Sequence, residues 1–278
     1  MSKRLQALYG LKYNPFSQEV PTSGLCVTPA IEGFCWRVEH QLDEGGFALI
    51  SGEPGTGKSV VLRILADRLG GRRDASVGIL CRPQASVADF YRELGDLFGV
   101  TLTASNRWGG AKVLRQKWQS YSEASLCRPV LLIDEAQAMS PGALCELRLL
   151  SSAELDRRCL LTVVLAGDER LGKKLQTDDL LPLASLIRCR LRCELADVGQ
   201  LKACLSHHLQ QAGNPRLLPP QLVDTLAEHA AGNYRVLMNL ANDLLAAAVQ
   251  RERETIDEKL FFEVFAPNPK PTRAVSKT

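Results

Sequence analysis

Residues 47–69, FALISGEPGTGKSVVLRILADRL, contain the pattern that decides the fold. A short apolar run with β-strand character comes first, a glycine-rich segment follows, and a segment with helical spacing comes last. The middle segment reads Gly-x-x-x-x-Gly-Lys-Ser, the pattern of a phosphate-binding loop when it joins a strand to a helix. Its glycines allow backbone N–H groups to converge on phosphate oxygens, and the helix N-terminus adds positive potential. We therefore predict a nucleotide-binding loop rather than a chance glycine-rich turn.

The motif predicts a role for each residue of this loop. Lys58 is expected to reach the β- and γ-phosphates of a nucleoside triphosphate. The Ser59 hydroxyl is expected to ligate Mg²⁺. The predicted nucleotide contacts are Gly52, Glu53, Pro54, Gly55, Thr56, Gly57, Lys58, Ser59 and Val60.

A second run, VLLIDE at residues 130–135, ends in two adjacent carboxylates. Asp134, at the tip of an apolar strand, can hold the magnesium shell through water and is the second predicted metal residue. Glu135 beside it can orient and polarise the attacking water, as a catalytic residue. The alternative is an ordinary solvated strand end, but the preceding phosphate-binding loop favours the catalytic interpretation.

The order of apolar runs and helical patterns predicts an α/β fold. Helical patterns separate short, nearly continuous apolar runs, as expected for parallel strands buried on both faces of a three-layer sheet domain. The four runs expected to be strands are 47–51, 76–81, 129–134 and 161–167. Three helical patterns between them lie at 60–69, 87–99 and 111–121.

The pattern changes near residue 196, after which helix follows helix. Asp197 is predicted to cap the first of them in a capping box with Gln200. We expect an α/β nucleotide-binding domain over 1–195, a small all-helical lid domain over 196–266 and a disordered basic tail over 267–278.

The composition is that of an ordinary globular protein. Of 278 residues, 45 % are hydrophobic and 23 % are charged. No window reaches the roughly 18 uninterrupted apolar residues that a membrane span needs, and the basic start lacks the apolar core of a signal peptide. We therefore expect a cytoplasmic protein without a membrane partner.

The charge and cysteine patterns restrict the classes of site. The net charge is +3, and Lys270, Arg273 and Lys277 of the tail account for all of it. Any contact with nucleic acid must therefore come from a local patch. Nine cysteines are scattered without a CxxC pair, which favours buried reduced thiols over a zinc site.

GEPGTGKS together with VLLIDEAQ resembles the AAA+ ATPases. The segment YGLKYNPF at residues 9–16, the segment after it and LAGDERL at 165–171 look like the group that includes ExeA, TnsC and TniB. The resemblance covers roughly residues 9 to 265. It implies ATP and Mg²⁺ as cofactors, and chains of this size in the group are mostly transposition regulators that assemble head-to-tail.

The resemblance also implies roles for residues outside the two motifs. Asp168 lies where the family places its first sensor, usually Asn, Thr or Gln; an aspartate would repel the γ-phosphate unless it is protonated, paired or turned toward water. Arg235 in GNYR resembles the second sensor, although an ordinary surface arginine is the alternative. Phe16, with Tyr9 and Leu11, is expected either to contact the adenine or to lie in the core.

The segment SLIRCRLRCEL, 185–195, alternates arginines with apolar residues, which on a strand places Arg188, Arg190 and Arg192 on one face. A solvated edge face is one interpretation. The family pattern implies another, in which Arg188 reaches the neighbouring subunit's nucleotide as an arginine finger, with Arg190 or Arg192 as substitutes.

Two loops are the candidate contacts with duplex DNA: 81–86 and 103–112. The family places these loops along its central channel, although polar loop residues are more commonly just solvated. The residue types suit phosphate contacts without sequence reading. The predicted contacts are Arg82, Ser86, Ser105, Asn106, Arg107 and Lys112.

The expected function is an ATP-dependent, DNA-binding regulator of transposition that forms a filament or ring and recruits a transposase and target-selection proteins. The alternatives are a secretion-assembly ATPase like ExeA, an initiator or clamp-loader-like switch, and an ATPase without a DNA role.

Overall fold

The computed structural model describes residues 2–81, 83, 86–101, 107–124, 127–153 and 158–266. They form two compact units. One unit is Leu25–Leu195, and the other combines residues 1–24 with the region from Ala196 onward. The first is an α/β unit and the second is helical.

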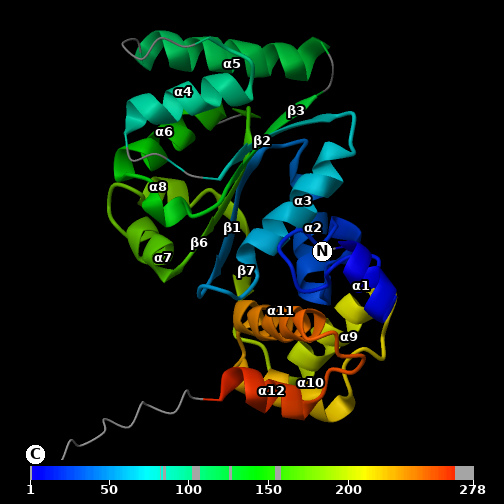
Figure 1. Ribbon diagram of the computed structural model, residues 1–278. Coiled ribbons are helices and arrows are strands. Elements are labelled where there is room, and N and C mark those ends of the chain that lie inside the picture. Colours follow the sequence, from blue (N-terminus) through cyan, green and yellow to red (C-terminus); the bar gives the residue numbers. More distant parts are fainter. Residues whose placement is uncertain are drawn as a thin grey trace, which may run out of the picture. The chain divides into compact units, whose positions relative to one another are not determined.

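A five-stranded parallel sheet forms the centre of the α/β unit (Figure 1). Its strands, in spatial order, are β2 (Ala75–Leu80), β3 (Arg128–Ile133), β6 (Thr162–Gly167), β1 (Gly46–Gly52) and β7 (Ile187–Cys193). Each neighbouring pair is parallel. The four apolar runs are therefore confirmed as strands, and the arginine-rich segment forms β7 at one edge.

Helices cover both faces of this sheet, as the three-layer prediction requires (Figure 1). On one face lie α2 (Pro29–Gln41) and α3 (Lys58–Gly70). On the other lie α4 (Val87–Leu97), α5 (Arg107–Ala124), α6 (Pro141–Ser151), α7 (Glu169–Leu175) and α8 (Leu181–Ala184). The short elements are η2 (Ala136–Ala138) and the antiparallel strands β4 (Ser152–Ala153) and β5 (Arg158–Cys159).

The main core of this unit lies between the sheet and α4 to α8. Trp118, Phe90 and Phe47 are among its largest fully buried side chains. Burial of this apolar area is the main stabilising term, and it keeps the strand ends in register. The candidate functional residues lie at the carboxyl ends of these strands.

The helical unit is discontinuous in sequence. Its elements are α1 (Ser2–Tyr9), η1 (Thr22–Gly24), α9 (Val198–Ala212), α10 (Pro220–His229), α11 (Tyr234–Gln250) and α12 (Glu258–Phe265). The capping box of Asp197 and Gln200 at the start of α9 is confirmed. The sequence places residues 1–24 within a 1–195 domain, whereas the structure groups them with the helices.

Both packing and hydrogen bonds explain that grouping. Leu5, Tyr9, Leu11 and Phe16 are buried in the same core as α9, α10 and α11. The Tyr9 hydroxyl donates to the carbonyl oxygen of Arg253 at 2.6 Å. Apolar residues in a sequence indicate burial, but they do not indicate which of two cores they enter. The packing of residues 1–24 with the helical unit could therefore not be predicted.

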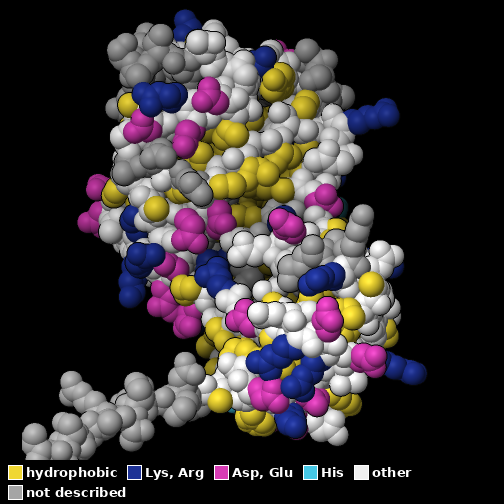
Figure 2. Space-filling view, viewed as in Figure 1, with side chains coloured by type: hydrophobic (Ala, Val, Ile, Leu, Met, Phe, Trp, Pro, Cys, Tyr) yellow, Lys and Arg dark blue, Asp and Glu magenta, His cyan; other side chains and the backbone are white. Residues whose placement is uncertain are grey.

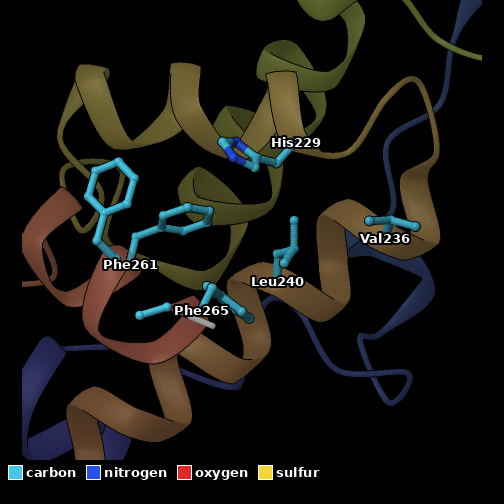
Figure 3. Close-up of a pocket in the computed structure, with 7 residues that line it drawn as sticks. His229, Val236, Leu240, Phe261 and Phe265 are labelled. Carbon is cyan, nitrogen blue, oxygen red and sulfur yellow. The ribbon is translucent and has the colours of Figure 1, made fainter. Parts of the chain in front are cut away.

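An apolar groove lies between α10, α11 and α12 in the helical unit (Figure 3). Leu240 of α11 and Phe261 and Phe265 of α12 line it together with His229. The lining is mostly apolar, and the groove belongs to the helical unit, whereas the phosphate-binding loop belongs to the α/β unit. In the described part of the chain, no helix is both long and apolar enough to cross a membrane.

Candidate nucleotide site

The phosphate-binding loop connects β1 directly to α3. β1 ends at Gly52 and α3 begins at Lys58, with Gly57 as its N-cap in the left-handed conformation at φ 100°. A residue with a Cβ is strained there, which explains the second glycine of the motif. The loop thus delivers the positive end of a 13-residue helix to the edge of the sheet.

The first glycine is required by close packing. A Cβ on Gly52 would lie 2.2 Å from the carbonyl oxygen of Cys193 on β7. The hydroxyl of Thr56 donates to the Glu53 carbonyl at 2.8 Å and braces the turn from inside. The loop is therefore fixed by its own residues and by the neighbouring strand.

Lys58 is buried beneath this loop with only 7 % of its surface exposed. Its ammonium donates to the carbonyl oxygens of Gly52 at 3.0 Å and Glu53 at 2.9 Å. These bonds satisfy a buried charge, as burial requires. The same donors can turn to phosphate oxygens, which are stronger acceptors because they are charged.

The ends of three neighbouring strands bring the remaining candidate residues to the same edge. β6 lies between β3 and β1, with Ser51 opposite Gly167 and Ile133 opposite Leu165. Asp134 directly follows β3 and Asp168 directly follows β6. The structure therefore brings the loop, the carboxylates and the sensor position together at the carboxyl edge of the sheet, where open α/β sheets bind ligands.

Asp134 and Glu135 differ in how they are held. Asp134 Oδ1 accepts from the Glu135 backbone N–H at 2.9 Å, and the Asp134 backbone N–H donates to Leu80 at 3.0 Å. Glu135 has a left-handed backbone, φ 52°, and its exposed carboxylate accepts a hydrogen bond from the Gln137 amide. A non-glycine residue in this conformation is uncommon and is frequent at functional sites.

Asp168 forms an ion pair at the end of β6. Arg170 forms an ion pair with it at 2.6 Å, and Asp168 also caps α7 by accepting from the Arg170 backbone N–H at 2.9 Å. The hydrogen bonds from Arg170 lower the pKa of Asp168, with a smaller contribution from the charge of Lys58. The carboxylate is therefore charged but largely compensated.

The donor set at this edge suits a magnesium ion. Ser59 is exposed at the start of α3 and Asp134 is partly exposed at the end of β3, and both offer oxygen ligands. Mg²⁺ commonly takes one or two protein oxygens and completes its shell with phosphates and water. The described residues contain no group of three or more His, Cys, Asp or Glu that could hold a metal, so an all-protein cage is not found among them.

Comparisons with known proteins agree with this geometry. Residues 40–175 match the family model described as AAA domain. The solved structure of ORC2 from Aeropyrum pernix in ADPNP–ADP complexes superposes with a TM-score of 0.72 at 14 % identity, covering 90 % of this chain and 70 % of that one. The chain has the P-loop AAA+ fold.

One sequence relative and one further solved structure are informative. General secretion pathway protein A of Aeromonas hydrophila is 32 % identical over 213 residues, which are 75 % of this chain and 38 % of that protein. This chain thus spans well under half of that relative's length. The Aeropyrum pernix ORC1 protein in complex with DNA superposes with a TM-score of 0.67 at 19 % identity, covering 88 % of this chain and 67 % of that one.

The three arginines of β7 lie on the exposed face of this AAA+ edge strand, where exposed and buried residues alternate as predicted. Arg188 pairs with Glu44, and its side chain is 60 % exposed. Arg190 donates to the Ala184 carbonyl at 3.2 Å. Arg192 lies 3.4 Å from Glu194. Arg188 is thus a largely exposed side chain that is ion-paired with Glu44 of its own chain.

Two predicted nucleotide contacts lie in the helical unit. Arg235 is exposed in the first turn of α11, where Asn233 caps the helix by accepting from the Arg235 backbone N–H at 3.0 Å. Phe16 is 4 % exposed and packs in the helical core. Its ring is therefore a core side chain, the second of the two alternatives.

The predicted DNA contacts have mixed outcomes. Arg82, Ser105 and Asn106 lie outside the described residues, and Arg107 is described only as the first residue of α5. Lys112 is exposed on α5. Ser86 caps α4 by accepting from the Asp89 backbone N–H at 3.1 Å, so its hydroxyl already has a structural role. Basic and acidic side chains are interspersed on the face shown in Figure 2.

Sequence reasoning missed three residues around the acidic pair. Gln137 contacts Glu135, Arg170 neutralises Asp168, and Lys174 donates to the carbonyl oxygen of Gln137 at 2.6 Å. For two of them, Gln137 and Arg170, the sequence contained a feature that could have indicated a role. Gln137 belongs to the DEAQ sequence, and Arg170 follows a predicted strand end by three residues.

Proposed function

We propose that this protein is an ATP-dependent, DNA-binding AAA+ regulator of DNA transposition. In this proposal it binds ATP with Mg²⁺, assembles head-to-tail on duplex DNA, and recruits and activates a transposase at the target. The observation that carries the ATPase part is the convergence of the phosphate-binding loop, Asp134 and Glu135 at one edge of the sheet.

The chain's own residues divide the work of hydrolysis. Lys58 exchanges its two carbonyl partners for phosphate oxygens and stabilises negative charge there. Ser59 and Asp134 would hold Mg²⁺, which supplies charge neutralisation when bound. Glu135 accepts a proton from the attacking water. We expect slow turnover in the isolated chain, because an isolated chain receives no arginine from a neighbouring subunit to neutralise the transition-state charge.

Assembly would supply the missing cation. In this proposal the guanidinium of Arg188, which lies exposed on edge strand β7 and is paired with Glu44, leaves that partner and serves a second subunit's nucleotide. A finger of this kind is worth about 10³–10⁵ in rate. Sharing the nucleotide across an interface also makes assembly depend on ATP, and a head-to-tail interface that does not close produces a filament. Arg235 is proposed as a second sensor of the γ-phosphate.

Two observations support the DNA-binding part of the proposal. The ORC1 structure that resembles this fold is in complex with DNA, and exposed Lys112 on α5 suits a phosphate contact. Each such contact is small, so binding would come from summing contacts along a filament. We propose a cytoplasmic location, with a transposase and target-selection proteins as partners.

A second candidate is a secretion-type assembly ATPase. The observation that favours it is the 32 % identity to general secretion pathway protein A. Both candidates use the same nucleotide site, and they differ in the partner that nucleotide binding controls. DNA dependence therefore separates them.

Electron microscopy tests the proposal directly. We expect ordered spirals or rings with duplex DNA and a slowly hydrolysed ATP analogue, and dispersed particles when either is omitted. A matched sample of the Lys58→Ala variant should stay dispersed throughout. Assembly with the analogue alone, unchanged by DNA and without DNA binding in a fluorescence anisotropy titration, would favour the secretion-type candidate.

A further inference from the structure

The side-chain amide of Gln137 joins two neighbouring strand ends of the nucleotide site. Its Nε2 donates to Oε2 of Glu135, after β3. Its Oε1 accepts from the backbone N–H of Asp168, after β6, at 3.3 Å. Gln137 is 8 % exposed, so these two protein partners take the place of water. One amide thus connects the proposed water-activating carboxylate to the sensor position.

The surroundings hold that amide in place. The ammonium of Lys174 donates to the carbonyl oxygens of Gln137 at 2.6 Å and Met139 at 2.7 Å, which fixes the backbone that carries the amide. On the other side, a Cβ on Gly167 would lie 2.7 Å from Oε1 of Gln137. The glycine at the end of β6 therefore leaves the space that the amide occupies.

The backbone at Glu135 supports a functional interpretation of this contact. Its φ of 52° is unfavourable for a residue with a side chain. Such a conformation persists only when the surrounding structure determines it. The bond from Gln137 and the bond between the Glu135 N–H and Asp134 Oδ1, at 2.9 Å, both fix this residue.

We propose that Gln137 is a positioning residue that orients the Glu135 carboxylate for water activation and couples it to the end of β6. The inference rests on the proposed ATP hydrolysis. A glutamine amide can donate a hydrogen bond without giving up its proton, so it orients the carboxylate but does not replace it as a base. The bond uses one carboxylate oxygen, and accepting a proton from water requires only the other.

The hydrogen bonds of Gln137 would transmit a movement at Asp168, the sensor position, to Glu135, the proposed general base. Asp168 lies in the field of Lys58 and pairs with Arg170, and Arg170 lies in the field of Glu135. A displacement of the β6 end would move the Asp168 N–H that donates to Oε1 of Gln137. Through the same rigid amide it would also move the Glu135 carboxylate. Misplacing a catalytic group by about 1 Å can cost about a hundredfold in rate.

Two variants test whether Gln137 orients the Glu135 carboxylate or only contributes to the stability of the fold. Gln137→Met keeps the side-chain length but removes both hydrogen bonds. Gln137→Glu keeps an acceptor for the Asp168 N–H but replaces the neutral amide donor with a second carboxyl group beside Glu135. For both we expect kcat for ATP hydrolysis to fall by about tenfold or more, with KM and the Kd for ATP within about twofold of wild type. The control Gln210→Met, at an exposed position on α9, should leave all three unchanged.

A double-mutant cycle with Glu135→Gln tests whether Gln137 acts through Glu135. We expect Gln137→Met to cause no further loss of kcat in the Glu135→Gln background. Equal losses in both backgrounds, an unchanged kcat in the single variants, or a raised kcat would overturn the inference. If Gln137→Met does not fold, as a thermal melt would show, the Gln137→Glu cycle decides the same question.

Failure of this inference is distinguishable from failure of the proposed function. If the wild type hydrolyses ATP and the Gln137 variants hydrolyse it at the same rate, only the positioning role of Gln137 is overturned. A well-folded wild-type chain that binds ATP but shows no turnover, with or without duplex DNA, overturns the hydrolysis proposal and the positioning role with it.

Discussion

Arg170 holds both carboxylate oxygens of Asp168 at the end of β6. Its Nε lies 2.8 Å from Oδ2 and 3.1 Å from Oδ1, and the same carboxylate caps the helix that carries the arginine. An acidic residue at this edge would otherwise oppose a triphosphate. The pair reconciles Asp168 with nucleotide binding without requiring the carboxyl group to be protonated.

The first prediction concerns this pair. Arg170→Ala should weaken the affinity for ATP several-fold more than the affinity for ADP, because the uncompensated Asp168 carboxylate repels the terminal phosphate. Asp168→Asn in the same chain should restore ATP affinity, since asparagine also caps helices well. Isothermal titration calorimetry with both nucleotides checks this. Equal losses for ATP and ADP would show that Asp168 does not face the terminal phosphate.

Lys58→Ala should reduce nucleotide affinity by about a hundredfold or more, because charge-assisted bonds to phosphate are lost. Lys173→Ala, an exposed lysine on α7, is the matched control and should bind normally. Calorimetry with Mg²⁺ measures both. Retained affinity in Lys58→Ala would contradict the assignment of the loop.

Glu135→Gln should retain ATP binding and reduce hydrolysis by about 10²–10⁴-fold, because the amide cannot accept the proton from water. The variant should also accumulate in the assembled state, since assembly is proposed to depend on unhydrolysed ATP. Phosphate release and light scattering report the two effects. Turnover at the wild-type rate would require another general base.

Arg188→Ala should reduce turnover by about 10³–10⁵-fold without changing the affinity of the dispersed chain for ATP. Mixing Arg188→Ala with Glu135→Gln should recover part of the activity, because an intact site in one subunit then receives Arg188 from the other. Arg190→Ala and Arg192→Ala are the controls. No recovery on mixing would mean that the arginine acts within its own subunit.

His208 predicts a pH effect on stability. It is buried in the helical unit, where its Nδ1–H donates to the Pro15 carbonyl at 2.9 Å. Burial is the main cause that lowers its pKa from 6.5. The unfolded chain therefore binds the proton first as pH falls below 6.5, so the free energy of unfolding should decrease there. Denaturant titrations across this range should show the decrease in wild type and in His207→Gln, and a smaller decrease in His208→Gln.

The features that could be predicted were those with a local signal. The phosphate-binding loop, the apolar strands and the capping box of α9 each depend on residues a few positions apart, and the structure contains all three. The alternation in 185–195 likewise predicts one exposed face, and β7 has it.

The features that could not be predicted depend on long-range choices. Phe16 is apolar, and nothing in its neighbours indicates whether it enters a core or contacts a base. Gln137 is close in sequence to Glu135, but its second partner, the N–H of Asp168, is 31 residues away. Short elements such as α8 and the β4–β5 pair also have too few residues to produce a periodic signal.

The hydrogen bond from Tyr9 to Arg253 joins residues 244 positions apart. The α/β unit is therefore inserted between two parts of a single helical body, and that body cannot be completed on the ribosome until α12 has emerged. Deleting residues 1–24 would uncover the apolar surface that Leu5, Leu11 and Phe16 now fill. An expression boundary chosen at the start of the α/β unit should consequently yield aggregating material, even though every residue of the phosphate-binding loop is retained.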